Sequence, residues 1–332
     1  MTETDEQTGT DNQSGTSDDA SSLRQSLGTA VKILVSVGSF GYLLWRFPIE
    51  QAFRSMFELD TVELVLIIPV VFLPIVLTSL SLQLLYEEYE QISFLPIFKV
   101  DTIDFIVNSF LPTRLGTLAT TPLMLNKYTG IKLRRAFIIK GVQLQMIAAI
   151  NGVVAMAGLI VLFDYLGQNV ALILFLSAMV YLSIPVGAFL LTRVNLPQFI
   201  VNRAPEMLST TTDMQYDALT RNKFESAALL FVSFVVLSGV RFGIIGASLG
   251  VDLPLLLYFL IPTLVYSVTV LPISIGGIGV TEVTGTTVLV TLGVQPSVAT
   301  SVVVLDRIFA AYLPLVLLYC YANYVIHADF DV

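Results

Sequence analysis

Long apolar runs separated by short polar connections make up most of the chain from residue 27 onward. A helix needs about 20 apolar residues to cross the roughly 30 Å of hydrocarbon in a bilayer. Seven runs reach this length, and we predict a membrane-spanning helix in each: 27–45, 62–86, 136–163, 170–192, 224–250, 252–273 and 297–325. The predicted fold class is therefore all-α, a polytopic transmembrane helical bundle.

Two further apolar segments, 98–126 and 274–293, are broken by proline, glycine and polar residues. Non-helical backbone at membrane depth is tolerated only where protein or a water-filled cavity surrounds it. We therefore expect two re-entrant or broken helical segments at these places rather than two more full crossings.

The first 26 residues differ in kind from the rest, because they are mostly Thr, Ser, Asp, Gln and Gly. Such a segment cannot bury enough apolar surface to offset the entropy of ordering it. It also lacks the basic start and apolar core of a signal peptide. We predict a disordered acidic cytoplasmic tail at 1–26, of a composition typical of a high-salt cytoplasm, a membrane domain at 27–325 and a short C-terminal tail at 326–332.

Composition excludes a soluble enzyme. Hydrophobic residues are 55% of the chain and charged residues only 13%, against about 25% charged in soluble domains. The net charge of −8 is concentrated in the tail, so the chain has no basic surface for nucleic acid. A single cysteine, Cys320, and a single histidine, His327, exclude an internal disulfide and a His-rich metal site. We expect no metal and no cofactor.

The distribution of Lys and Arg predicts the orientation, because cytoplasmic loops are enriched in both. An inside N-terminus leaves only Arg46 and Arg54 in outer segments. The basic residues in inner segments are then Arg24, Lys32, Lys99, Arg114, Lys127, Lys132, Arg134, Arg135, Arg193, Arg203, Arg221 and Lys223. We predict a multi-pass protein of the cell membrane with a cytoplasmic N-terminus and, from seven spans, an outside C-terminus.

Five ionisable residues fall within apolar segments: Lys140, Arg241, Glu282, Asp306 and Arg307. A charge at the membrane centre costs at least ~2.5–3.5 kcal/mol, so it needs a partner or a wet cavity. Lys140 is close to a span end and is expected to extend to the interface. Asp306 and Arg307 lie about 14 Å into their span, near the midplane. Either Glu282 or Asp306 is the expected partner of Arg241, in a structural ion pair or a transport site.

Four glycines form a stripe on the span that contains Arg241. At about 100° per residue, Gly239, Gly243, Gly246 and Gly250 fall on the face opposite the arginine. Small residues at this spacing let two helices approach closely. We therefore predict that the glycine face packs against a neighbouring helix and that Arg241 faces a polar group.

An internal repeat links the two broken segments. The stretch 111–118, which begins Leu-Pro, parallels 271–278, and each continues into a short Thr-rich apolar run. Each run is followed by Gly-x5-Ala at the start of a long span. Broken helices at equivalent places in two halves indicate a transport site; chance similarity between apolar sequences is the alternative. The span count places both segments on the same side of the membrane.

At these residues the chain resembles the flippase-like integral membrane family, also called the lysylphosphatidylglycerol synthase transmembrane-region family, over about 27–325. Leu111-Pro112-x-Arg114-x-Gly116 is similar to its Arg-x-Gly-Glu element, although Thr117 replaces the glutamate. Gly276-Gly277-x-Gly279-x2-Glu282 is close to its Gly-Gly-x-Gly-x-x-Glu motif, and Asp306-Arg307 is similar to its last helix. Gln143 and Gln145 stand where the family often has acidic and arginine residues.

The resemblance implies a stand-alone membrane part without the aminoacyl-transfer domain of the bacterial synthases. We expect a translocase rather than an enzyme, which moves or helps to move an anionic phospholipid or a polyprenol-linked lipid between leaflets. Arginines and helix N-termini can bind a headgroup phosphate, and Glu282 is the candidate proton carrier. The expected substrate-binding residues are Arg114, Gly116, Arg241, Gly276, Gly277, Gly279, Glu282, Asp306 and Arg307.

Two other functions stay open. One is a membrane-embedded glycosyl or lipid transferase that uses polyprenyl phosphates, with Glu58 and Asp60 as an acidic pair; these residues can equally be solvated loop charges. The other is a scaffold for cell-envelope assembly. Membrane lipids are the expected partners, and a homo-oligomer or proteins of cell-envelope biosynthesis are further candidates.

Overall fold

The computed structural model describes residues 60–110, 116–193, 220–271, 274 and 277–330. Every regular element in these ranges is helical, which confirms the all-α prediction. Five of the helical segments are long and apolar enough to cross a membrane. The predicted span at 27–45, the acidic tail and the sequence-predicted residues Arg114 and Gly276 lie outside the described residues.

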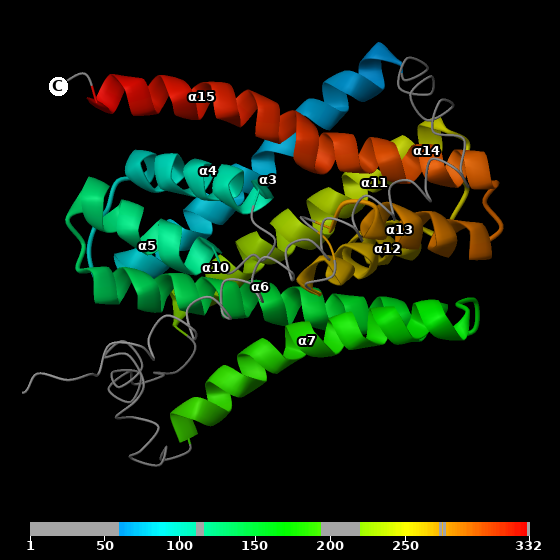
Figure 1. The fold of residues 1–332 in the computed structure, drawn as a ribbon, viewed down its shortest axis with the longest axis horizontal. Helices are drawn as coiled ribbons and strands as arrows, with labels where there is room; N and C mark the ends of the chain where they lie inside the picture. Colours follow the sequence, from blue (N-terminus) through cyan, green and yellow to red (C-terminus); the bar gives the residue numbers. More distant parts are fainter. Residues whose placement is uncertain (1–59, 111–115, 194–219, 272–273, 275–276, 331–332) are drawn as a thin grey trace, which may run out of the picture.

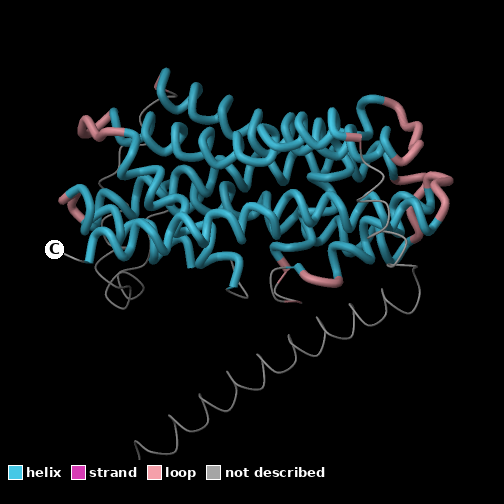
Figure 2. The backbone as a smooth tube through the Cα atoms, turned by 90° about the horizontal axis from the view of Figure 1, so that it is seen from above, coloured by secondary structure: helices cyan, strands magenta, loops and turns pink. Residues whose placement is uncertain are grey.

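The long helices run roughly along one common direction (Figures 1 and 2). Two of them contain a π-helical turn, η2 (Val232–Val236) and η5 (Ile308–Tyr312), where one helix continues into the next. The helices of this set are α3 (Thr61–Glu87), α6 (Leu133–Leu162), α7 (Gln168–Arg193), α10 (Arg221–Phe231) with α11 (Leu237–Ser248), and α14 (Pro296–Arg307) with α15 (Leu313–Phe330).

Two pairs of shorter helices complete the bundle. The first pair is α4 (Phe94–Phe110) and α5 (Gly116–Thr129); the second is α12 (Leu255–Ser267), extended by the 3-10 turn η3 (Val268–Val270), and α13 (Val280–Thr291). The two helices of each pair contact each other. At 1.5 Å per residue each helix is only about 18–26 Å long, so each pair is a hairpin that enters the bundle and turns back.

The two hairpins enter from opposite ends of the bundle, which contradicts the expectation that they share a side. Leu125 of α5 packs with Ala136 and Ile139, in the first part of α6. Leu264 of α12 instead contacts Gly158, near the other end of α6. Positions 136 and 158 are about 33 Å apart along the helix, and Figure 1 shows the hairpins at the two ends.

The reason for this error is the segment at 252–273, which was predicted to cross the membrane and does not. Its apolar residues form α12, which ends at Ser267 and is followed after a break by α13. Because this segment turns back, α15 runs to the end of the bundle where α7 ends and α10 begins (Figure 1). The C-terminal helix therefore does not end on the opposite side from the end of α7, as seven spans would require. It continues to Phe330 and includes most of the predicted tail at 326–332.

The exits of the two hairpins are built alike, as the repeat predicts. Gly130 (φ 73°) and Gly293 (φ 89°) both end their hairpin in the left-handed region, which favours glycine. Six residues later, Ala136 and Ala299 are both fully buried in the first turn of a long helix. The N–H of Ala136 donates to the N-cap carbonyl of Lys132, and the N–H of Ala299 donates to that of Gln295.

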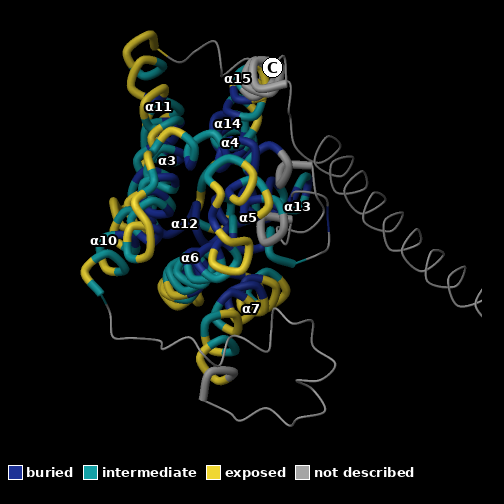
Figure 3. Tube along the Cα trace, turned by 90° about the vertical axis from the view of Figure 1, so that its left-hand side faces the viewer, coloured by how far each residue is buried: buried dark blue, intermediate teal, exposed yellow. Residues whose placement is uncertain are grey.

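Many large apolar side chains are exposed on the outside of the bundle and several charged side chains are buried inside it, as expected for a protein surrounded by lipid. Large exposed apolar residues are frequent on α3 and α7, for example Leu66, Leu172 and Phe175. Figure 3 shows exposed positions along the outside of α7 and buried positions in the centre of the bundle. The interior is where the candidate site lies.

Candidate functional site

The break between α12 and α13 depends on glycine. Gly277 (φ 77°) and Gly279 (φ 81°) both adopt the left-handed region. A Cβ on Gly277 would also lie 2.6 Å from Thr269 Cγ2 and 2.7 Å from Thr281 Oγ1. Both glycines are therefore needed for the chain to turn here and start α13 at Val280.

Glu282 lies where the sequence placed it, buried in the first turn of this short helix. Its Oε2 accepts a hydrogen bond of 2.7 Å from the Gly279 backbone N–H. This contact satisfies one of the amides that a helix N-terminus leaves without an intrahelical partner. The Gly279 amide, expected to be available to a phosphate, is thus occupied by the carboxylate in this conformation.

Arg307 approaches the same carboxylate from α14. Its Nε lies 3.5 Å from Glu282 Oε1, and both side chains are buried. The guanidinium carbon is also 5.2 Å from the centre of the Tyr266 ring and 6.0 Å from that of Tyr312. Aromatic faces at these distances stabilise a cation, so the arginine is held by rings as well as by the carboxylate.

Arg241 binds the residue next to Arg307. Its Nε donates to Asp306 Oδ1 at 2.7 Å and its Nη2 donates to Oδ2 at 3.4 Å. Of the two partners expected for Arg241, the structure therefore selects Asp306. Because Asp306 and Arg307 are consecutive, the two ion pairs connect α11, α13 and α14 in the interior of the bundle.

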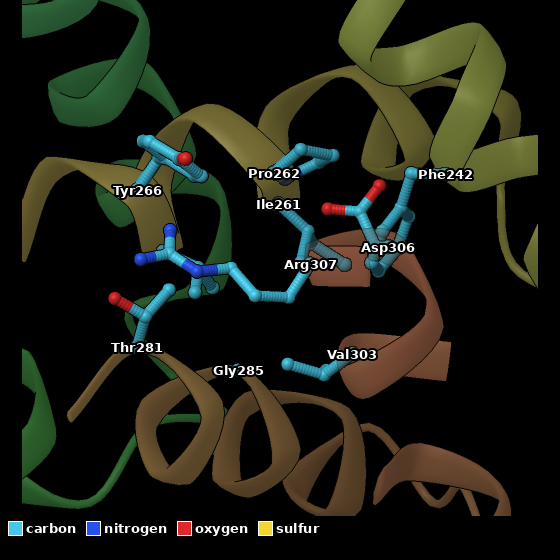
Figure 4. A pocket seen from close by; sticks show the side chains of 10 residues that line it. Phe242, Ile261, Pro262, Tyr266, Thr281, Gly285, Val303, Asp306 and Arg307 are labelled. Carbon is cyan, nitrogen blue, oxygen red and sulfur yellow. The ribbon is translucent and has the colours of Figure 1, made fainter. Parts of the chain in front are cut away.

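A small cavity of about 20 Å³ adjoins these charges (Figure 4). Figure 4 shows the Arg307 side chain extending away from Asp306 toward Tyr266 and Thr281. Thr281 Oγ1 is buried and forms no hydrogen bond to any described residue. This volume suits about one water molecule, so a lipid headgroup does not fit in this conformation.

The glycine stripe on α11 packs against α12, as predicted, at two of its four positions. A Cβ on Gly239 would lie 2.2 Å from the Phe259 ring, and one on Gly246 would lie 3.0 Å from the Tyr258 ring. Gly243 makes only an ordinary contact, at 3.7 Å. The prediction is wrong for Gly250, which has open space around it and follows the end of the helix with φ 72°.

A second group of buried charges was not predicted from the sequence, and the expectation that Lys140 extends to the interface is wrong. Lys140 is 4% exposed. Its Nζ lies 3.3 Å from Asp101 Oδ1, 3.6 Å from Asp104 Oδ2 and 3.0 Å from Gln143 Oε1. The spacing of Asp101 and Asp104, three residues apart on one helix face, was the available signal. Gly116, a predicted site residue, begins the adjoining helix α5.

The alternative of a transferase relied on an acidic pair, Glu58 and Asp60. Glu58 lies outside the described residues. Asp60 is exposed and is the N-cap of α3. Its backbone N–H donates to Glu63 Oε2 at 3.0 Å, the contact expected of a capping box. In the part of the chain that the structure describes, no three Asp, Glu, His or Cys residues gather as metal ligands.

Comparison with known proteins agrees with the resemblance seen in the sequence. The family described as the lysylphosphatidylglycerol synthase TM region matches residues 29–317. Neither a curated protein sequence nor a solved structure matches the chain. The match includes both hairpins and all of the buried charges described above. The chain is therefore a multi-pass membrane protein and belongs to the lysylphosphatidylglycerol synthase transmembrane-region family.

Proposed function

We propose that the protein moves, or helps to move, an anionic lipid between the two leaflets of the cell membrane, and that the headgroup phosphate binds Arg307 on the way. An anionic phospholipid and a polyprenol-linked lipid share this phosphate chemistry. The observation that carries the proposal is a buried arginine at the break between two re-entrant helices. Interrupted helices near the midplane are where transporters commonly bind their substrates.

The two arginines of the site are held differently. The Arg241–Asp306 contact, at 2.7 Å, has the length of a strong charge-assisted hydrogen bond. The Arg307–Glu282 separation, at 3.5 Å, is longer than such a bond. We therefore propose that Arg241 has a structural role and holds α11 against α14. Arg307 is the residue that releases the Glu282 carboxylate and binds the phosphate instead.

Glu282 gives this exchange a proton step. When a phosphate takes over Arg307, Glu282 loses its positive neighbour and remains buried. A buried carboxylate without a cation favours the protonated form. We propose that Glu282 takes up a proton as the lipid binds Arg307 and gives it back as the lipid leaves.

Translocation requires the second hairpin to move, because the cavity beside Arg307 holds about one water. Gly277 and Gly279 are the natural hinge, since their φ angles are open to glycine alone. The closed conformation keeps Arg307 away from the surrounding lipid. We propose that displacement of α13 relative to α12 opens a path for the headgroup, while the lipid tails stay in the bilayer.

The orientation proposed from the sequence gains support from the revised fold. Described Lys and Arg residues outside the bundle interior gather at the end where the first hairpin opens, among them Lys132, Arg134, Arg135, Arg221 and Lys223. The connections at the opposite end, 163–167, 249–254 and 292–295, contain neither residue type. By the positive-inside rule we propose that the first hairpin opens to the cytoplasm. In this orientation α3 begins on the outer side of the membrane. An N-terminus on the cytoplasmic side then requires one membrane crossing before α3.

Replacement of Arg307 by glutamine tests this function. The full chain is reconstituted into liposomes, and the rate at which a labelled anionic phospholipid changes leaflet is measured. Because hydrogen bonds to charged groups contribute ~1.5–3 kcal/mol, we expect the rate to fall about tenfold or more. Arg221→Gln is the matched control, since Arg221 is exposed and pairs with Glu225 in the next turn. A folded Arg307→Gln protein with the wild-type rate would refute the role of Arg307.

A further inference from the structure

Thr281 of the second hairpin has a buried hydroxyl group that is not used within the fold. The residue is 4% exposed, and its Oγ1 forms no hydrogen bond to a described residue. A threonine inside a helix usually avoids this by donating to a backbone carbonyl in the preceding turn. Thr287 of the same helix does so, with a bond of 2.7 Å to the Val283 carbonyl oxygen. Burial of a hydroxyl without a hydrogen bond is unfavourable, so the Thr281 hydroxyl is a donor available to a ligand.

This hydroxyl lies beside the buried arginine of the site. Thr281 and Arg307 line the same small cavity, and the Arg307 side chain extends toward Thr281 (Figure 4). Thr263 and Thr286 of the second hairpin also have buried hydroxyls without a hydrogen bond to a described residue, but neither lines this cavity. Of these three threonines, only Thr281 therefore adds a hydroxyl donor to a buried cation.

The start of α13 gives the same place a third feature that favours an anion. The helix begins at Val280, so Thr281 is in its first turn, at the positive end of the helix dipole. A Cβ at Gly277 would lie 2.7 Å from Thr281 Oγ1, so the glycine leaves room for the hydroxyl. Release of Glu282 from Arg307, which the proposed function requires, leaves a guanidinium and a hydroxyl together near a helix N-terminus. Arginines and helix N-termini are common binding groups for phosphate.

We infer that Thr281 is a second phosphate-binding residue of the lipid site. Arg307 binds one oxygen of the headgroup phosphate, and the Thr281 hydroxyl donates a hydrogen bond to another. The phosphate then supplies the acceptor that this hydroxyl lacks within the fold. The inference rests on the proposed function, because it concerns the same site.

Replacement of Thr281 by valine tests the inference, because valine keeps the shape of the side chain and removes only the hydroxyl. Binding of a short-chain phosphatidylglycerol to the purified full chain in detergent is measured from the rise of the thermal unfolding midpoint with lipid concentration. We expect the affinity of Thr281→Val to fall at least about tenfold, since a hydrogen bond to a charged group is lost. Thr281→Ser keeps the hydroxyl and should retain an affinity close to that of the wild-type protein.

The stability of the protein without lipid separates a binding role from a structural one. Thr281→Val should unfold at or above the wild-type midpoint, because it removes a buried hydroxyl that has no partner. Thr286→Val is the matched control, since it removes the same kind of hydroxyl from the same helix, away from the cavity. It should have a similar effect on the midpoint and leave the affinity for the lipid unchanged.

Three results would overturn the inference: wild-type affinity in Thr281→Val, an equal loss of affinity in Thr286→Val, or a lipid-free Thr281→Val midpoint well below that of the wild type. The last result would mean that the hydroxyl already has a partner within the fold. Inorganic phosphate, tested in place of the lipid, should raise the midpoint less at equal concentration, and an equal or larger rise would overturn the assignment to a lipid. Weak binding by Arg307→Gln with wild-type affinity in Thr281→Val would refute this inference alone, whereas wild-type affinity in both variants would also refute the proposed function.

Discussion

Replacement of Gly239 by alanine tests whether direct contact between α11 and α12 positions Arg241. A Cβ at Gly239 would lie 2.2 Å from Phe259 Cδ1 and 2.9 Å from Phe259 Cα. The ring can rotate away, but the Cα atom belongs to the backbone of α12. The two helices must therefore separate to admit one methyl group.

The expected size of the effect follows from two opposing contributions. Alanine in a helix interior is favoured over glycine by about 1 kcal/mol. Overpacking of a tight contact costs ~1–3 kcal/mol, and a backbone clash places Gly239 toward the upper value. We expect a net loss of about 1–2 kcal/mol for Gly239→Ala. Gly243→Ala is the matched control, because its nearest neighbour would be 3.7 Å away, and it should be neutral or stabilising by up to about 1 kcal/mol.

The measurement is the thermal unfolding midpoint of the two purified variants in the same detergent. Gly239→Ala should unfold below the wild-type protein and Gly243→Ala at or above it. The rate of lipid movement should also fall in Gly239→Ala, since a displaced α11 changes the Arg241–Asp306 contact. A Gly239→Ala protein at least as stable as the Gly243→Ala protein would refute the proposed helix contact.

Three further predictions follow from the charges and the topology. Asp306→Leu alone should destabilise the fold by ~3–5 kcal/mol, because it leaves Arg241 buried without its partner. Adding Arg241→Met should restore much of this stability. Additive losses of stability in thermal unfolding would contradict the ion pair. Cysteines at Asp164 and Arg221, in a Cys320-free protein, should react with an impermeant reagent from opposite sides of the membrane; reaction from the same side would refute the fold. Glu282→Gln should keep the cap on Gly279 and fold normally but lose lipid movement, and a wild-type rate would leave Glu282 with only a capping role.

The long helices and the Arg241 face were predictable because their signals are local and periodic. Run length identifies a spanning helix, and the 3.6-residue period places the glycines opposite Arg241. The depth of Asp306 and Arg307 in an apolar run similarly indicated a buried pair. Glu282 could be placed because glycines precede it and a helix must begin after them.

The topology of the second hairpin could not be read in the same way. The residues of α12 are as apolar as those of a full span, and hydropathy does not distinguish a helix buried in protein from one that crosses lipid. The packing of the folded helices, such as that of Leu264 on Gly158, shows where the hairpin lies. This one error reversed the predicted side of the C-terminus and of the second broken segment.

The charged cluster of the first hairpin was missed for a related reason. Asp101 and Asp104 lie in the segment 98–126, which is predicted as a broken helix, and nothing in its local pattern places the two carboxyl groups beside Lys140. Lys140 lies only eight residues after Lys132, so it seemed able to reach the interface. Three charges that are separately unfavourable in a membrane become compatible with burial once the fold brings them together.

The most direct test of the account is the movement of lipids with and without a phosphate charge. Labelled anionic phospholipid and labelled neutral diacylglycerol are compared in liposomes with the wild-type protein and in protein-free liposomes. We expect the protein to accelerate leaflet exchange of the anionic lipid well above the protein-free rate and to leave the rate of the neutral lipid unchanged. Equal rates of the anionic lipid with and without protein would contradict the account.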